Sequence, residues 1–151
     1  MSANHSRLQG TAVCALLVAL ALPGAAGAAP KDCTITSVGG VAFGNYLWSD
    51  RNPTDSLGTI NYDCGTTALV ALSAGRSGSS TQRKLTSGAS SLNYNLYIDP
   101  ARTQIWGDFF FGGLPQIVQG KSSLNVYGRI PPGQNVAAGA YTDTIIVTFL
   151  F

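Results

Sequence analysis

Apolar and polar residues alternate along several short stretches of the chain, and this two-residue period limits the fold more than any other feature. Residues 59–64 put Ile60, Tyr62 and Cys64 on one side of an extended chain. Side chains of a β-strand point alternately to opposite faces, whereas helical side chains repeat every 3.6 residues, a period that no stretch here shows. Further strands are expected over residues 41–46, 68–74, 84–86, 92–98 and 123–130.

Stretches rich in Gly, Pro, Asn, Asp and Ser separate these strands, and such clusters are typical of turns. They lie at residues 49–56, 75–81, 99–103 and 131–139. Because the strands are short, closely spaced and not interrupted by helices, we expect an all-β domain built as an antiparallel sandwich. The chain has no Glu and few Lys, which also disfavours helices.

The last segment, residues 141–151, is the longest run of β-forming residues. An extended chain would place Tyr141, Ile145, Val147, Phe149 and Phe151 on one face, with Ile146 and Leu150 on the other. An edge strand this apolar invites aggregation, so the segment is predicted to be a central strand with a neighbour on each side.

Residues 1–28 have the layout of a cleavable secretory signal. Arg7 gives a positive start, and residues 11–22 form an uncharged apolar run that is too short to span a bilayer. The sequence Ala26-Gly27-Ala28 then predicts cleavage after Ala28, which also removes Cys14. The alternative is a retained membrane anchor. The mature domain is therefore predicted to be residues 29–151, without a membrane span.

Cys33 and Cys64 are the two cysteines that remain after this cleavage. Exported chains meet an oxidising compartment, so we expect one Cys33–Cys64 disulfide. The chain-entropy model gives such a bridge roughly 3–4 kcal/mol of stabilisation.

The mature domain lacks the side chains of common catalytic and metal sites. The single histidine, His5, lies in the predicted leader, so a Ser–His–Asp triad or a zinc site is not expected. The seven Asp residues are scattered, which favours solvated loop acids over a glycosidase pair. Asp143 is interpreted as fixing a turn rather than binding calcium. The sequence predicts no enzyme, no cofactor and no metal.

Basic residues give equally little sign of a binding site. Arg76, Arg83 and Lys84 could contact acidic glycans, but an ordinary solvated surface is the preferred interpretation. The near balance of charge, without a basic stripe, argues against nucleic acid as a partner.

Three adjacent aromatic residues, Phe109, Phe110 and Phe111, allow two interpretations. Neighbouring side chains on a strand cannot all face one side, so at least one ring is exposed or covered by a partner. The segment could therefore make hydrophobic contact with a surface or a neighbouring subunit. The alternative, which we prefer on sequence grounds, is a fully buried strand after a core Trp106.

Several phrases taken together resemble the spore coat protein U domain family, which includes subunits of archaic chaperone–usher pili of the Csu type. These phrases are VAFGNY at 41–46, GTINYDC at 58–64, LSAG at 72–75, LNYNLY at 92–97, WGD at 106–108, YGRIP at 127–131 and GAYTDT at 139–144.

The resemblance implies an incomplete immunoglobulin-like sandwich that lacks its last strand. A periplasmic chaperone lends a strand to the open groove, and an outer-membrane usher exchanges it for the N-terminal extension of the next subunit. In this chain the groove would be bordered by the terminal strand, with Tyr141, Ile145, Val147, Phe149 and Phe151 as its residues. The protein would then pass through the periplasm to the cell surface and act in adhesion or biofilm formation.

One departure from the family concerns strand donation. Only residues 29–32 precede Cys33 in the predicted mature chain, and Pro30 has no N–H for a ladder. Such a chain receives a strand but does not give one, which suggests a tip or terminal subunit, or a coat component. The alternative function is a self-complete secreted module that binds a glycan or surface ligand.

Overall fold

The computed structural model describes residues 5–9, 32–108 and 110–151, and the described part is almost entirely β-structure. The strands and the single 3-10 turn, η1, are β1 (His5–Gln9), β2 (Cys33–Gly39), β3 (Thr54–Leu72), η1 (Gly75–Ser77), β4 (Arg83–Ser87), β5 (Ser90–Tyr97), β6 (Gln116–Ile130) and β7 (Thr144–Leu150). The predicted all-β class is confirmed.

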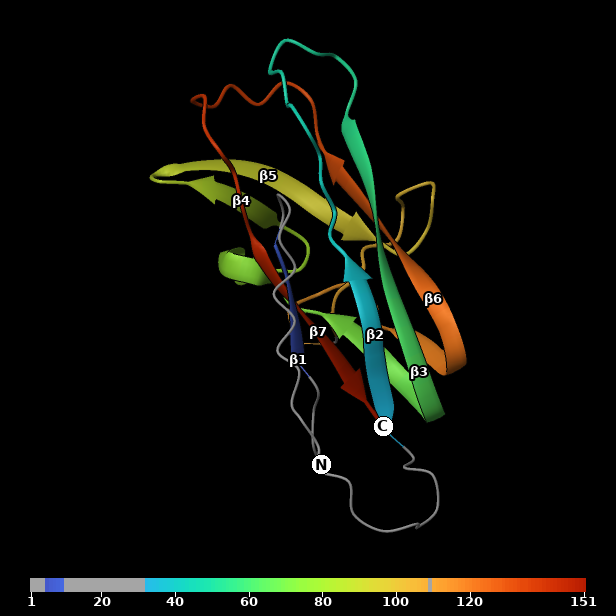
Figure 1. Cartoon of the computed structure of the whole chain (residues 1–151). Helices are drawn as coiled ribbons and strands as arrows, with labels where there is room; N and C mark the ends of the chain where they lie inside the picture. Colours follow the sequence, from blue (N-terminus) through green and yellow to red (C-terminus); the bar gives the residue numbers. More distant parts are fainter. Residues whose placement is uncertain (1–4, 10–31, 109) are drawn as a thin grey trace.

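The strands form one curled, antiparallel sheet in the order β1-β7-β3-β6-β5-β4, with β2 also paired to β3. One edge of β3 pairs with β6 over most of its length, and the other edge takes β2 first and β7 afterwards. The β4–β5 hairpin crosses the long strands at a steep angle, so that the sheet closes over itself (Figure 1). This arrangement agrees with the predicted immunoglobulin-like sandwich.

The predicted alternation places most of the expected residues in the core. Ile60, Tyr62 and Cys64 are buried on β3, and β5 buries Leu92, Tyr94 and Leu96 in the same way. On β6, Val126 and Ile130 are buried. β3 and β6 both extend further than predicted. Residues 54–58 of β3 pair with β6, and residues 116–122 of β6 pair with β3, although neither stretch has a clear apolar alternation.

The predicted strand over residues 41–46 is wrong, although Val41 and Phe43 are buried as a strand would bury them. These residues run outside the ladders formed by the described part of the chain. Their place is set instead by Gly128 of β6, where a side chain is excluded. A Cβ on Gly128 would lie 2.5 Å from Val41 Cγ1 and 2.7 Å from Phe43 Cζ, so the close approach needs a glycine.

The predicted disulfide is present and joins β2 to β3. Cys33 and Cys64 are directly opposite each other in the ladder, with Cα atoms 4.0 Å apart, and both side chains are buried. Tyr62, two residues before Cys64, packs its ring against Phe149 of β7 at 6.0 Å between centroids. The bridge therefore fastens β2 beside the part of the core that β7 completes.

Arg83 is fully buried, so its assignment to a solvated or glycan-binding surface is wrong. Its guanidinium donates to the Asn95 side chain and to backbone carbonyls that come from separate parts of the chain. These carbonyls belong to Leu72, Ser73, Ser80 and Trp106. Burial lowers the pKa of Arg83 to about 10, which still leaves the group charged at neutral pH. Among the described residues, the core thus contains one cation, and mainly backbone oxygens satisfy it.

Asp143 has the turn-fixing role predicted for it. It is fully buried, and one carboxylate oxygen accepts from the backbone N–H groups of Arg76 at 3.0 Å and Thr144 at 2.8 Å. The other oxygen accepts from the Tyr94 hydroxyl at 2.7 Å. These contacts fasten the start of β7 to η1 and to β5. Burial beside this carboxylate raises the pKa of Tyr94, so the hydroxyl remains a donor at neutral pH.

Candidate functional site

The edge of β7 that faces away from β3 has an unusual neighbour. Val147 and Thr148 pair with Leu72 and Ala71 on one side. On the other side, residues 144–148 of β7 pair antiparallel with β1, from His5 opposite Thr148 to Gln9 opposite Thr144. β1 belongs to the segment that the sequence predicts to be cleaved. In the described part of residues 29–151, the ladder partner of β7 is β3 alone.

Four of the five residues predicted to border a groove lie in the core. Ile145, Val147 and Phe149 are at most 2% exposed, and Tyr141 is 7% exposed just before the strand begins. Phe151 differs, because it is 39% exposed after the end of β7. The face and the spacing follow the predicted alternation. Whether a partner strand covers these side chains stays a prediction.

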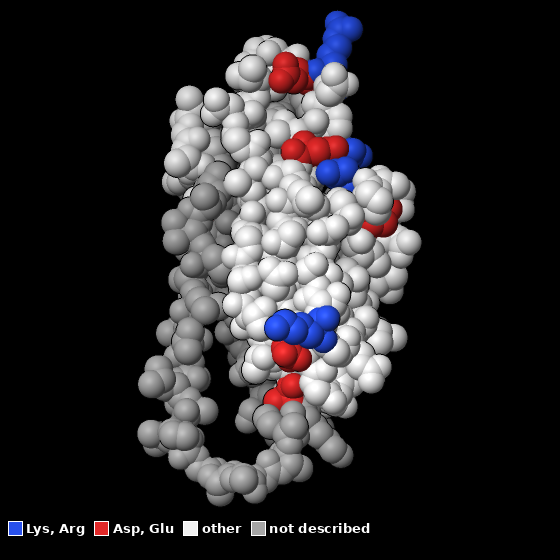
Figure 2. Space-filling view, turned by 45° about the vertical axis from the view of Figure 1, so that its right-hand side comes forward, with Lys and Arg blue, Asp and Glu red and all other residues white. Residues whose placement is uncertain are grey.

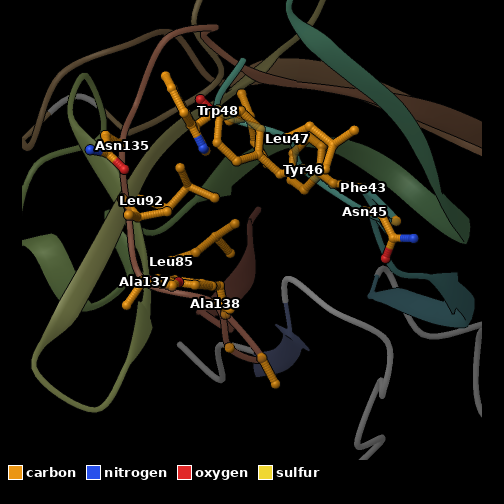
Figure 3. A pocket seen from close by; sticks show the side chains of 16 residues that line it. Phe43, Asn45, Tyr46, Leu47, Trp48, Leu85, Leu92, Asn135, Ala137 and Ala138 are labelled. Carbon is orange, nitrogen blue, oxygen red and sulfur yellow. The ribbon is translucent and has the colours of Figure 1, made fainter. Parts of the chain in front are cut away.

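A cavity of about 760 Å³ lies beside Tyr141, just before the first residue of β7. Its walls are residues 43–48 on one side and residues 135–141 on the other, and Leu85, Leu92 and Ile130 complete the lining. Figure 3 shows Phe43, Tyr46 and Trp48 facing Leu85 and Leu92 across the opening. The lining contains no charged side chain, so it favours uncharged apolar groups.

Hydrogen bonds between separate loops hold the cavity walls in place. The Tyr46 hydroxyl accepts from the Gln134 backbone N–H at 2.7 Å, and the Gln134 side chain bonds both backbone groups of Asn93. The Tyr141 hydroxyl donates to the Ala137 carbonyl at 2.6 Å. At the mouth, Leu47 and Trp48 are 58% and 59% exposed. This apolar mouth was not predicted, although the adjacent Leu47 and Trp48 just before the turn-rich stretch 49–56 gave a signal for it.

Phe110 and Phe111 are exposed, by 88% and 57%, so the preferred prediction of a fully buried strand is wrong for both. Phe109 lies outside the described residues. The reason is local: Asp108 Oδ1 accepts the backbone N–H groups of Phe110 and Phe111, which bends the chain into a turn. Gly112 and Gly113 then take positive φ angles of 93° and 81° and reverse it. Trp106 is fully buried, as predicted.

Charged side chains form no single-sign patch on the face shown in Figure 2, where basic and acidic residues lie close to one another. Lys84 is exposed, and Arg76 reaches the Thr86 hydroxyl at 3.3 Å. The described residues contain no cluster of three His, Cys, Asp or Glu side chains able to hold a metal ion. No helix in the same part of the chain has the length and apolar character needed to cross a bilayer. The absence of enzymatic activity stays a prediction.

The ion pairs of the described residues centre on Asp55. Arg129 contacts both carboxylate oxygens at 2.7 and 2.8 Å, and Arg102 approaches one of them at 3.3 Å. The hydrogen bonds from Arg129 hold the pKa of Asp55 below its ordinary value of 3.8. Its stabilising contribution is therefore complete above about pH 4 and is lost as the pH falls through the folded-state pKa.

We expect Asp55→Asn to lower the free energy of unfolding at pH 7 by less than about 1 kcal/mol, because these side chains are about one-third exposed and solvent screens the pair. Urea unfolding of both proteins at pH 7 and at pH 2 measures the effect. The difference should shrink at pH 2, because acid protonates Asp55 and removes the charge that Arg129 pairs with. An equal difference at both pH values would mean that the charge of Asp55 is not its cause.

A comparison with known protein families finds a match to the Spore Coat Protein U domain over residues 19–148. The chain belongs to that family. The resemblance seen in the sequence is thereby confirmed, and the matched range covers every strand from β2 to β6 and most of β7.

Among curated proteins, Protein U of Myxococcus xanthus is 32% identical over 126 residues. The alignment covers 83% of this chain and 59% of the relative, so the chain spans only part of that protein's length. Among solved structures, a similar chain is found in the CsuC–CsuE chaperone–tip adhesion subunit complex of Acinetobacter baumannii Csu pili. The identity is 20% and the TM-score 0.45, over 80% of this chain and 39% of the other.

Proposed function

We propose that this protein is an exported structural subunit of a coat or a chaperone–usher-type pilus, and that it receives a β-strand from a partner at the edge of β7. One observation carries the proposal. Within the described part of residues 29–151, β7 pairs on one edge only, although its inward side chains complete the core. The edge facing away from β3 accommodates an antiparallel strand, since β1 lies there in the full chain.

The alternating backbone of β7 makes this edge suitable for strand addition. Ser73 N–H donates to the Ile146 carbonyl, and Ile146 N–H donates to the Ser73 hydroxyl, so the polar groups of Ile146 face β3. Successive residues of a strand direct these groups to opposite edges. Ile145, Val147 and Phe149 therefore direct theirs to the outer edge, where an added strand supplies hydrogen bonds and its alternate side chains supply specificity.

The uncharged cavity beside Tyr141 lies on the path of a strand added at this edge of β7. A strand running antiparallel to β7 passes Thr144 and continues toward the cavity, where bulky apolar side chains find room. In the proposed assembly, the donors are a periplasmic chaperone and then another subunit delivered by an outer-membrane usher. Because only residues 29–32 precede Cys33 after the predicted cleavage, we propose a tip or terminal position at the cell surface, with a role in adhesion.

Hydrogen exchange of individual amides tests strand acceptance. In the oxidised chain 29–151, we expect the amides of Ile145, Val147 and Phe149 to exchange faster than those of Ile146 and Thr148. Adding a purified periplasmic pilus chaperone, or a synthetic peptide of another subunit's N-terminal extension, should protect the first group. The amides that face β3 are the internal control, because their protection should change little.

The opposite result is equally clear. If the isolated chain melts cooperatively, protects both groups of amides equally and binds neither chaperone nor peptide, the strand-acceptor function is wrong. Such a domain would be the self-complete binding module that the sequence left as the alternative.

A further inference from the structure

We propose that a polar hollow on the outer face of β2, β3 and β6 binds an acidic polysaccharide, and that Lys121 pairs with its carboxylates. The three strands lie side by side, with β3 in the middle (Figure 1). The hollow has a volume of about 480 Å³, and small-molecule sites measure about 300–1,000 Å³. Its lining shares no residue with the larger cavity or with β7, so the inference goes beyond strand acceptance and does not depend on it.

The side chains of the hollow belong to one row across the sheet and to the residues beside that row. In the ladder, Asn61 of β3 is opposite Ser37 of β2 and opposite Ser123 of β6, and it lies between the buried Ile60 and Tyr62. Residues that are opposite each other in a ladder share a face, and successive residues alternate. The row is therefore on the face turned away from the core. Besides Tyr62, the lining consists of polar residues: Thr36, Ser37, Asn61, Lys121, Ser122 and Ser123.

Two departures from regular pairing flank the hollow and bring consecutive polar residues to it. The β2–β3 register shifts between Ile35 and Ser37, so that Thr36 is an extra residue, and both Thr36 and Ser37 are exposed. On β6 the pairing with β3 is irregular next to Gly120, whose φ is 69°, and residues 121–123 after it are all exposed. Bulges redirect side chains and are frequent beside functional sites. Two of them at one polar hollow indicate a site rather than an ordinary strand surface.

The lining suits a sugar better than an apolar ligand. Small-molecule sites are lined mostly by apolar groups, whereas this lining supplies hydroxyls, an amide and an ammonium group. Hydroxyl and amide side chains both donate and accept hydrogen bonds, as sugar hydroxyls do. Asn61 Nδ2–H donates to Ser37 Oγ at 2.7 Å, which positions these two side chains before a ligand arrives. Such pre-organisation lowers the entropy lost on binding.

Lys121 determines the charge of the ligand. Of the described residues that line the hollow, it is the one with a charged side chain. Asp63 is opposite Lys121 in the ladder but lies outside the lining, and the ion pairs of the described residues centre on Asp55 instead. An exposed ammonium group among uncharged hydroxyls favours carboxylates that are separated by hydroxyl groups. A polyuronate, which is a polymer of sugar carboxylates, has this chemistry, and a hollow on the surface of a sheet lets a polymer cross it.

Binding of the oxidised exported chain to immobilised polygalacturonate, with neutral dextran as the reference polymer, tests the proposal. We expect Lys121→Gln to weaken polygalacturonate binding by about tenfold, as for the loss of a charged hydrogen bond. Dextran should bind more weakly than polygalacturonate by a similar factor, because it carries no carboxylate. Lys84→Gln is the matched control, since it removes an exposed lysine of β4 that is not in the lining. Its affinity should stay within about twofold.

A second variant separates recognition of sugar hydroxyls from attraction to a positive charge. Ser122→Ala/Ser123→Ala leaves the net charge unchanged and removes two hydroxyl partners from the lining. We expect it to weaken polygalacturonate binding by about fivefold. Near-ultraviolet circular dichroism verifies that each variant is folded.

Three results would overturn the inference. The first is unchanged polygalacturonate binding by folded Lys121→Gln, and the second is dextran binding as tight as that of polygalacturonate. The third is full affinity in the double serine variant, because charge alone would then explain the attraction. Strand acceptance is measured separately, by amide exchange along β7, so a failure of that function leaves the polysaccharide result interpretable.

Discussion

Replacing Arg83 with alanine is expected to lower the free energy of unfolding by about 3–5 kcal/mol, or to prevent folding altogether. The guanidinium is fully buried and donates to Asn95 and to backbone carbonyls at the end of β3 and before the Phe110 loop. Its removal leaves several buried acceptors without donors and opens a void among them. The loss arises from unsatisfied backbone groups rather than from a broken ion pair.

Urea unfolding followed by the fluorescence of buried Trp106 measures this effect. Arg76→Ala is the matched control, because Arg76 is exposed and its guanidinium donates to the exposed-side Thr86 hydroxyl at 3.3 Å rather than to buried carbonyls. We expect that variant to change the unfolding free energy by less than about 0.5 kcal/mol. Equal stability of the two alanine variants would show that the buried guanidinium does not hold the fold together.

The double substitution Cys33→Ser/Cys64→Ser is expected to cost roughly 3–4 kcal/mol, the second large loss. Both cysteines are buried and face each other across β2 and β3, so the bridge restricts the unfolded chain while matching the native register. Without it, β2 is held by its ladder with β3 and by the packing of Ile35 and Val38 against the core. A domain of this size has a total stability of about 5–15 kcal/mol, so the loss is a large fraction.

Thermal or urea unfolding of the oxidised protein, the reduced protein and the double variant checks the prediction. Reduction and double substitution should destabilise the chain to a similar degree. Cys14→Ser in the precursor is the control, because the predicted cleavage removes that residue. A double variant as stable as the oxidised protein would contradict a stabilising bridge.

The sequence predicts the core face of this protein well because burial follows the two-residue period. Ile60, Tyr62, Leu92 and Val147 are all buried where alternation puts them. The disulfide follows from cysteine number and compartment. Asp143 follows from the ordinary tendency of Asp to fix turns.

Other features depend on contacts between distant segments, which no local pattern encodes. Arg83 is buried because carbonyls from three separate segments converge on it. The sequence around it indicates only a short strand with two basic residues. The exposure of Phe110 has a local cause instead, because Asp108 accepts its backbone N–H in a hydrogen bond that outweighs the apolar character of the rings.

The candidate site likewise has one part that the sequence predicts and one part that it does not. Its strand, β7, could be predicted from composition and alternation, including the inward Ile145, Val147 and Phe149, whereas the predicted Phe151 lies exposed after the strand ends. The cavity could not, because its walls come from residues 43–48 and 135–141, which are far apart in the chain and meet only in the folded protein.

Gly128 gives the cavity a property that its lining residues alone do not explain. The ring of Phe43 rests where a methyl group on residue 128 would be, so the position of that wall is set by bare backbone and not by a side chain that can rotate. The backbone at Gly128 therefore sets the width of the opening. A single added carbon at residue 128 would push that wall aside and change the width of the opening.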